Sequence, residues 1–256
     1  MLMFHGLSRF STDLDFNLLD PTQTEEIYHR LEKIVTKFGA IADEAMKFYG
    51  PVIVLNYGKG ERMLKIEVSN RQYDNHYEIK NLLGTDIRVM TMPDMFAHKL
   101  CALGERVTPR DIYDVWFFLQ NHTEINSNIV RLRTDVAFAD YLQLCAKRVR
   151  ESSPKVLMQG LGEVLLNNQS KNFVKKQLLE ETALNLELFA MCPLVATQKP
   201  TERMKMIDAY PELIRQIKAK DVDLSTVSES QLHQLVDEKQ TLAFRNSLGE
   251  TVEIKF

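Results

Sequence analysis

The stretch RFSTDLDF, residues 9–16, decides how the rest of the chain is interpreted. It sets Asp13 and Asp15 two positions apart in a strand-like alternation with Leu14 and Phe16. Side chains at positions i and i+2 of a strand point to one face, so the two carboxylates share a face and the two apolar residues pack on the other. Such a pair suits Mg²⁺ or Mn²⁺, since Mg²⁺ usually takes only one or two protein carboxylates together with substrate phosphates. The alternative is the solvent face of an amphipathic edge strand, and this stretch alone does not decide between the two.

An α/β region follows the predicted strand. Asp20-Pro21 should end it, and Thr22 should cap a helix, with Glu25 completing a capping box. Strand-like runs then occur at residues 52–57, 63–68 and 87–90, with glycines at the turns between them. These runs predict a mixed sheet within an α/β domain that spans residues 1–91.

From residue 92 onward the apolar residues recur mainly at helical spacing. The predicted helices lie at residues 93–106, 109–121, 126–147, 153–168, 170–190, 201–219 and 228–236, and residues 241–256 read as a small β hairpin. The expected fold class is therefore α+β: a mixed β-sheet with helices, followed by a mostly helical domain over residues 92–256.

The composition is that of a globular protein, with 45% hydrophobic and 26% charged residues. The formal net charge of −3 argues against a chain-wide electrostatic attraction to nucleic acid. Cys101, Cys145 and Cys192 are far apart and lack metal-ligand spacing, which predicts neither disulfides nor zinc and fits the cytoplasm. The longest apolar runs are too short to cross a membrane, so no membrane association is expected.

Two motifs in the expected order carry a resemblance to a known family. Arg9, Ser11, Asp13 and Asp15 resemble the R-x-S-x-D-L-D-F signature of the nucleotidyltransferase AbiEii/AbiGii toxin family, a branch of the polymerase-beta-like nucleotidyltransferases. Residues 96–114 are similar to its later A-x-K-L-x-A-L…R…R-D-x-x-D motif. The resemblance implies a nucleotidyltransferase-like sheet and a metal-dependent transfer from an NTP.

The first motif then implies a metal site in the sheet. Asp13 and Asp15 would hold the cation, and the resemblance implies a third carboxylate on a neighbouring strand, for which Glu67 is the candidate. Its alternative is a solvated strand residue near Lys65. Ser11 would contact a phosphate or a metal-bound water, and Arg9 a triphosphate or a nearby acid.

The second motif implies a phosphate-binding helix. By the resemblance, Lys99 contacts the nucleotide phosphates, while Arg110 and Asp111 close the site, with Asp111 a general base or the group that orients Lys99. Asp114 competes for that role. The alternative is that the two acids hold Arg106 and Arg110 in a buried ion-pair network. His98, beside Lys99, is expected to face solvent.

The region before the first motif departs from the family pattern. Family members present a Gly-Gly turn about a dozen residues before the Asp-x-Asp, where backbone N–H groups receive the triphosphate. Here Gly6 stands alone after Met1. We expect that the sequence starts at an internal methionine, and that transfer is weak if the turn is truly absent.

The leading expectation is an enzyme, a nucleotidyltransferase that acts as the toxin of a toxin–antitoxin or phage-defence pair. By the resemblance, it moves a nucleotide from an NTP to an RNA, such as the tRNA 3′ end, and has a cognate antitoxin as partner. Basic clusters at residues 131–133 and 147–150 are the expected RNA contacts. Two alternatives stay open: an inactive nucleotidyltransferase fold that binds nucleotide or a partner, and a phosphotransferase that acts on protein.

Overall fold

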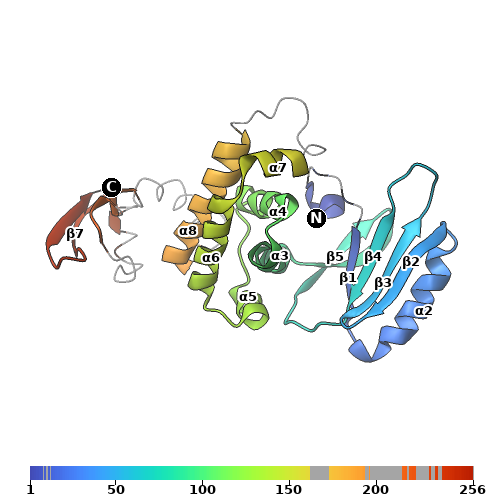
Figure 1. The fold of residues 1–256 in the computed structure, drawn as a ribbon. Coiled ribbons are helices and arrows are strands. Elements are labelled where there is room, and N and C mark those ends of the chain that lie inside the picture. The colour runs from blue at the N-terminus through green and yellow to red at the C-terminus, as the bar shows by residue number, and fades with distance from the viewer. Residues whose placement is uncertain are drawn as a thin grey trace. The chain divides into compact units, whose positions relative to one another are not determined.

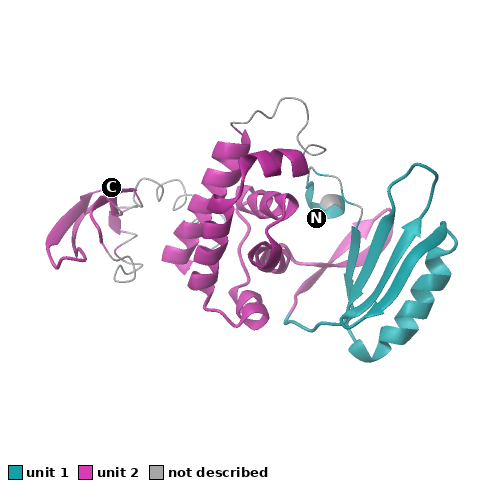
Figure 2. Cartoon of the chain, viewed as in Figure 1, with its two compact units in different colours: residues 1–74 teal, residues 75–256 magenta. Residues whose placement is uncertain are grey.

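A computed structural model provides the fold (Figure 1). It describes residues 1–7, 9, 11, 13–161, 173–193, 196, 215–217, 219–222, 231, 234–235 and 238–255. The chain divides into two compact units, Met1–Asp74 and Asn75–Phe256, which Figure 2 draws in different colours. Each unit is described by itself.

The first unit is a four-stranded sheet with one long helix. Its elements are α1 (Leu2–His5), β1 (Asp13–Asn17), the 3₁₀ helix η1 (Pro21–Gln23), α2 (Thr24–Val35), β2 (Ala40–Lys47), β3 (Gly50–Asn56) and β4 (Leu64–Ser69). The strand order is β1-β4-β3-β2, with β1 parallel to β4 and the other neighbours antiparallel. The sheet is therefore mixed, as predicted.

One face of this sheet is covered by α2, as Figure 1 shows. The apolar core between them consists of Val35, Ile53, Leu55 and Ile66, with Leu14, Tyr28, Leu31, Ile41 and Leu64 packed against it. Because side chains alternate along a strand, the residues that follow and precede these core positions in β1 and β4 lie on the opposite face. That opposite face carries the carboxylates considered below.

The start of α2 differs from the predicted capping box at Thr22 and Glu25, which is wrong. The carboxylate of Asp20 instead accepts hydrogen bonds from the backbone N and the hydroxyl of Thr22, 2.9 and 2.6 Å long, and thereby caps η1. Pro21 occupies the first turn of η1, where its missing N–H costs nothing. The short 3₁₀ turn thus displaces the α-helical start by a few residues.

The second unit begins with a hairpin and continues with helices. Its elements are β5 (Tyr77–Leu82), β6 (Thr85–Met90), α3 (Met92–Arg106), α4 (Pro109–Gln120), α5 (Ser127–Thr134), α6 (Phe138–Glu151), α7 (Pro154–Gly160), the π-helix η2 (Phe173–Glu181), α8 (Thr182–Met191), β7 (Thr241–Arg245) and β8 (Thr251–Lys255). The α+β class is confirmed, and β7 pairs with β8 as the predicted terminal hairpin.

The boundary between the units falls after Asp74, whereas the predicted domains meet at 91/92. Hydrogen bonds tie the segment between these points to α3. The backbone N of His76 donates to the buried carboxylate of Asp94, the backbone N of Thr91 donates to the carbonyl of His76, and Asn75 bonds His98. The β5–β6 hairpin therefore belongs with the helices.

Helix α3 lies at the centre of the second unit and is surrounded by α4, α5 and α6 (Figure 1). Phe96 of α3 stacks on Phe118 of α4 with ring centroids 4.8 Å apart. The wholly buried residues of this core include Leu100, Leu103, Ile112, Ile129, Leu142 and Phe189. This packing fixes the positions of the polar residues that α3 and α4 carry.

Some predicted elements differ from the observed ones. The helix predicted at 126–147 is two helices, because Asp135 adopts a left-handed conformation (φ 54°) that ends α5. The strands β2 and β5 were not predicted. The helix predicted at 153–168 is described as far as residue 161, and those at 201–219 and 228–236 fall almost entirely outside the described residues.

Within the described part of the chain, no helix combines the length and the apolar character that crossing a membrane requires.

Replacing Gly104 by alanine is expected to destabilise the protein by about 1–3 kcal/mol, although alanine normally favours a helix. A Cβ at this position of α3 would lie 2.0 Å from the hydroxyl oxygen of Tyr141, which donates a 2.9 Å hydrogen bond to the carbonyl of Cys101. Thermal or urea unfolding measures the effect. The double variant Gly104→Ala, Tyr141→Phe removes the overlapping oxygen and should recover part of the loss; a Gly104→Ala protein more stable than the wild type contradicts this packing.

Candidate active site

The carboxylates of the first motif lie on one face of the first unit's sheet. In the parallel β1–β4 pair, Asp13 is opposite Lys65 and Asp15 is opposite Glu67. Leu14, opposite Ile66, points to the other face and into the core. Both aspartates are exposed. The predicted period of two thus brings Asp13, Asp15 and Glu67 together on a single face.

The edges of the first motif fit the prediction less well. Phe16, expected to pack, remains 49% exposed. Strand pairing begins only at Asp13, so Arg9 and Ser11 precede β1 and are partly buried there. The alternation of a strand therefore does not extend to them, and the expectation that Ser11 shares the face of Asp13 through strand geometry is wrong.

Lys65 is the cation of this face, and its role was not predicted. Its ammonium forms an ion pair with the carboxylate of Glu67, two residues along β4. This hydrogen bond raises the pKa of Lys65; partial burial opposes it, and the charges of Glu67, Asp15 and Asp13 add to the rise. The lysine therefore senses all three carboxylates. The strand alternation of Lys65 and Glu67 was the signal that could have found it.

The donor set determines whether a metal ion fits this face. Among the residues that the structure describes, no three carboxylate, imidazole or thiol side chains gather as a ligand set. Asp13 and Asp15 nevertheless supply hard oxygen donors from one strand face, which is the number of carboxylates that Mg²⁺ usually takes from a protein. Glu67 would become a further donor only after it leaves Lys65. The chemistry of the two aspartates therefore fits a divalent cation.

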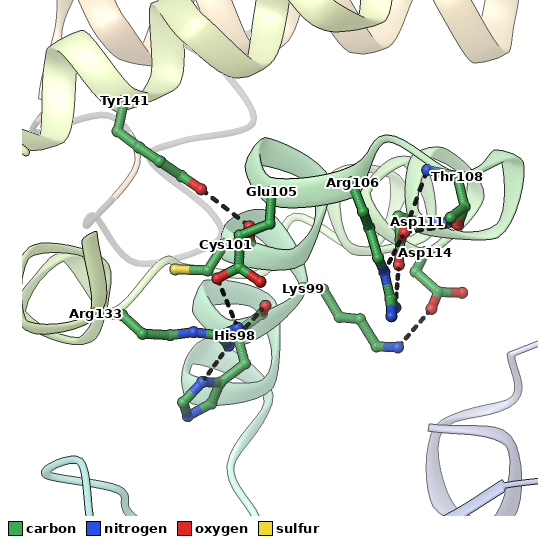
Figure 3. Close-up of polar contacts among 10 residues, drawn as sticks. All are labelled: His98, Lys99, Cys101, Glu105, Arg106, Thr108, Asp111, Asp114, Arg133 and Tyr141. Carbon is green, nitrogen blue, oxygen red and sulfur yellow. Dashed lines mark hydrogen bonds and ion pairs between the residues drawn. The ribbon is translucent and has the colours of Figure 1, made fainter. Parts of the chain in front are cut away.

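The second motif forms the junction between α3 and α4 in the second unit (Figure 3). The carboxylate of Asp111 accepts hydrogen bonds from Nε and Nη2 of Arg106, 2.9 and 3.0 Å long. It also accepts from the hydroxyl of Thr108 at 2.6 Å and from its backbone N, while the Thr108 hydroxyl accepts from the backbone N of Asp111. This is a complete capping box at the start of α4.

These contacts bear on the role of Asp111. Burial raises its pKa, but the hydrogen bonds from Arg106 and Thr108 and the charges of Arg106 and Lys99 outweigh burial and hold the pKa below its usual value. A weakly basic carboxylate whose oxygens already accept several donors is a poor proton acceptor. The arrangement favours the second of the predicted roles, the holding of Arg106.

Lys99 instead pairs with Asp114. Its Nζ lies 2.9 Å from the carboxylate of Asp114, whose side chain is only 1% exposed, whereas the Lys99 side chain is 27% exposed. The buried acid thus fixes a lysine that still reaches solvent. Of the two acids considered for orienting Lys99, the structure gives the contact to Asp114.

The two cations of this junction act on a common carboxylate. Arg106 binds Asp111 directly, and Lys99 lowers the pKa of Asp111 through its charge. The guanidinium of Arg106 is 62% exposed, so it combines a fixed geometry with access to solvent. Arg110, in the first turn of α4, is partly buried. Sequence reasoning gave Arg106 only an architectural role; its position at the turn between two helices was the available signal.

His98 does not face solvent as predicted. Its Nε2 lies 2.8 Å from the side-chain oxygen of Asn75, and its Nδ1 lies 3.1 Å from Nη1 of Arg133 (Figure 3). Arg133 also donates to Glu105 at 3.0 Å. The network joins α3 to α5 and to the start of the second unit, so His98 contributes to architecture.

The two basic clusters expected to contact RNA are engaged with acids. Arg133 is only 11% exposed and bonds Glu105. Arg150 of the second cluster makes two hydrogen bonds, 2.7 and 2.8 Å long, to the carboxylate of Glu187. These pairs neutralise the cations, and the prediction of RNA contacts gains no support from them.

Comparison with known proteins gives one family. The sequence model of the family described as "Nucleotidyl transferase AbiEii toxin, Type IV TA system" matches residues 1–198, which include the first unit and the second as far as the end of α8. No curated protein matches the chain.

Two solved structures from Helicobacter pylori are similar. One is JHP933, which is 21% identical, with 85% of this chain and 85% of that chain covered and a TM-score of 0.42. The other, provisionally identified as a nucleotidyltransferase, is 23% identical, with 74% of this chain and 80% of that chain covered and a TM-score of 0.41.

Proposed function

Because the chain belongs to the AbiEii nucleotidyl transferase toxin family of type IV toxin–antitoxin systems, we propose that it is a metal-dependent enzyme that moves a nucleotide from an NTP to an RNA acceptor. The observation that carries the proposal is the exposed pair of Asp13 and Asp15 on one face of the β1–β4 pair. A structural role for two exposed neighbouring anions is hard to find, since they repel each other.

In this proposal the first unit holds the cation. Asp13 and Asp15 bind Mg²⁺ or Mn²⁺ directly, and Glu67 is the third carboxylate of the same face. The ion, when bound, neutralises phosphate charge and stabilises the departing pyrophosphate. The carboxylates keep their geometry because β1 is paired along its length with β4.

The second unit supplies the cations for the phosphates. Lys99 contacts them, oriented by the buried Asp114, and Arg106 is a second candidate because Asp111 fixes it while its guanidinium stays exposed. Arg9, Ser11 and Arg110, the remaining predicted nucleotide contacts, are kept as part of the proposal; they are partly buried. Fixed cations stabilise charge that develops during transfer without reorganising at that moment.

The acceptor and the protein partner follow from the family. We assign the acceptor to the 3′ end of tRNA and the partner to a cognate antitoxin, as part of a toxin–antitoxin or phage-defence pair. Both assignments rest on the family match over residues 1–198.

Incubation of the chain with Mg²⁺, total tRNA and each NTP, labelled at the α or the γ phosphate, tests the proposal. Label from the α phosphate on RNA is the expected result. Label from the γ phosphate on protein would show the phosphotransferase alternative instead. Nucleotide binding without any transfer would show an inactive nucleotidyltransferase fold.

Lys99→Met is expected to reduce transfer about 100-fold, as loss of a fixed charge-stabilising group does. Since the variant leaves Asp114 buried without this partner, the double variant Lys99→Met, Asp114→Asn separates lost chemistry from lost stability. Lys147→Met is the matched control, because Lys147 is also paired with an acid, Glu151, but both side chains are well exposed on α6. Full activity of Lys99→Met would refute the role of Lys99.

A further inference from the structure

Lys65 lies among the carboxylates to which the proposed function assigns the metal. It is paired with Asp13 across the parallel β1–β4 ladder, and it forms an ion pair with Glu67 on its own strand. Asp15 is opposite Glu67 in the same ladder. Because paired positions of neighbouring strands put their side chains on one face, all four groups share the face that α2 does not cover.

The other neighbour strand leaves this lysine without a competing acid nearby. In the antiparallel β3–β4 pair, Lys65 is opposite Val54 and Glu67 is opposite Val52. The paired positions on that side are apolar, so the charges next to Lys65 in the ladder are those of Asp13, Asp15 and Glu67. Its side chain is 41% exposed and that of Glu67 is 36% exposed.

Three carboxylates on adjacent positions repel one another, and a cation that lies among them relieves the repulsion. A divalent cation relieves it more strongly, but it needs the carboxylate oxygens as ligands. The oxygen of Glu67 that pairs with the ammonium cannot at the same time serve a metal ion well, because the two cations would repel each other at short range.

We propose that Lys65 is the internal counter-ion of the carboxylate face, and that a divalent cation competes with it for Glu67. Lys65 then sets the affinity of the face for the metal: the ion pair with Glu67 must open before Glu67 can join Asp13 and Asp15 as a ligand. This inference rests on the proposed function, since it concerns the same metal ion.

Binding of Mn²⁺ to the full chain without nucleotide tests the inference, with free Mn²⁺ measured by electron paramagnetic resonance. Lys65→Met, which keeps the length and removes the charge, is expected to bind Mn²⁺ about fivefold more tightly, the size of effect typical of a partly exposed ion pair. Lys65→Arg keeps the charge and should bind like the wild type.

The chain offers a matched control in β5. Lys80 pairs with Glu78, also two residues apart on a strand, with Nζ and Oε1 3.2 Å apart and similar exposure. Across the β5–β6 ladder these residues are opposite Ile87 and Val89, which carry no charge. Lys80→Met should therefore leave Mn²⁺ binding unchanged.

A second readout does not involve metal binding. In the presence of a chelator, Lys65→Met should melt at a lower temperature than Lys80→Met, because the three carboxylates lose the cation that separates them. Added Mn²⁺ should raise the melting temperature of Lys65→Met more than that of the wild type.

Asp13→Ala distinguishes the possible failures. If Asp13→Ala weakens Mn²⁺ binding but Lys65→Met binds no more tightly than the wild type, the counter-ion role is overturned and the metal site stands. If Asp13→Ala changes Mn²⁺ binding neither in the wild type nor in the Lys65→Met background, the face holds no metal, and both the inference and the proposed metal site are overturned.

Discussion

Asp13→Asn is expected to lower nucleotidyl transfer by about 10³-fold and to leave the melting temperature unchanged. The change removes an anionic metal ligand and replaces it with an amide of the same shape, and loss of one group that stabilises transition-state charge costs about 10²–10³ in rate. Asp13 is exposed at the edge strand β1, so its replacement opens no cavity. The measurement is the rate of α-label transfer to RNA together with thermal unfolding.

The same sheet offers a control for this variant. Asp43 of β2 is also exposed and is opposite Val54 in the β2–β3 ladder, two strands away from β1. Asp43→Asn makes the same chemical change and should keep full activity. Equal activity of Asp13→Asn and Asp43→Asn would contradict the assignment of the metal to Asp13.

Asp111→Ala is expected to cost about 2–3 kcal/mol of stability, from the loss of an N-cap interaction and of charged hydrogen bonds. The Asp111 carboxylate, 2% exposed, closes the capping box with Thr108 and binds Arg106 through two nitrogens. Urea or thermal unfolding gives the magnitude. Arg106→Ala should cost less, because its exposed guanidinium is the more easily replaced by water.

The contribution of Asp111 should also depend on pH. Since its pKa is lower in the folded than in the unfolded state, its stabilisation is fully present above the unfolded pKa of about 3.9 and is lost as the pH falls through the folded value. Asp111→Asn lacks this titration, so the stability difference between wild type and variant should shrink below about pH 4. A difference that stays constant down to pH 2 would show that the charge of Asp111 does not stabilise the fold.

The sequence predicted those elements whose local pattern agrees with their tertiary surroundings. Leu14 between two aspartates marks β1, and the Pro-Asp start of α3 marks its first turn. The strand β2 was missed because its sequence, AIADEAMK, contains mostly residues that favour helices. Pairing with the buried strand β3 overrides that preference, and no local signal reports such pairing.

The candidate site shows the same division. The period of two in β1 and β4 was enough to place Asp13, Asp15 and Glu67 on one face. Which acid meets Lys99 was not readable, because Asp111 and Asp114 are one turn apart on α4 while Lys99 belongs to α3. The relative rotation of two packed helices decides the partner, and it arises from contacts such as the stack of Phe96 on Phe118.

The pairing of β1 with β4 has a consequence for synthesis of the chain. The aspartates belong to an edge strand whose only neighbour in the first sheet is β4, with Asp13 opposite Lys65 and Asp15 opposite Glu67. A strand that pairs with a distant segment cannot form until that segment has left the ribosome, and such non-local pairing is slow. The carboxylate face therefore assembles only after β4 has emerged, so a nascent chain that ends before residue 69 carries the Asp-x-Asp sequence without the geometry that gives it a function.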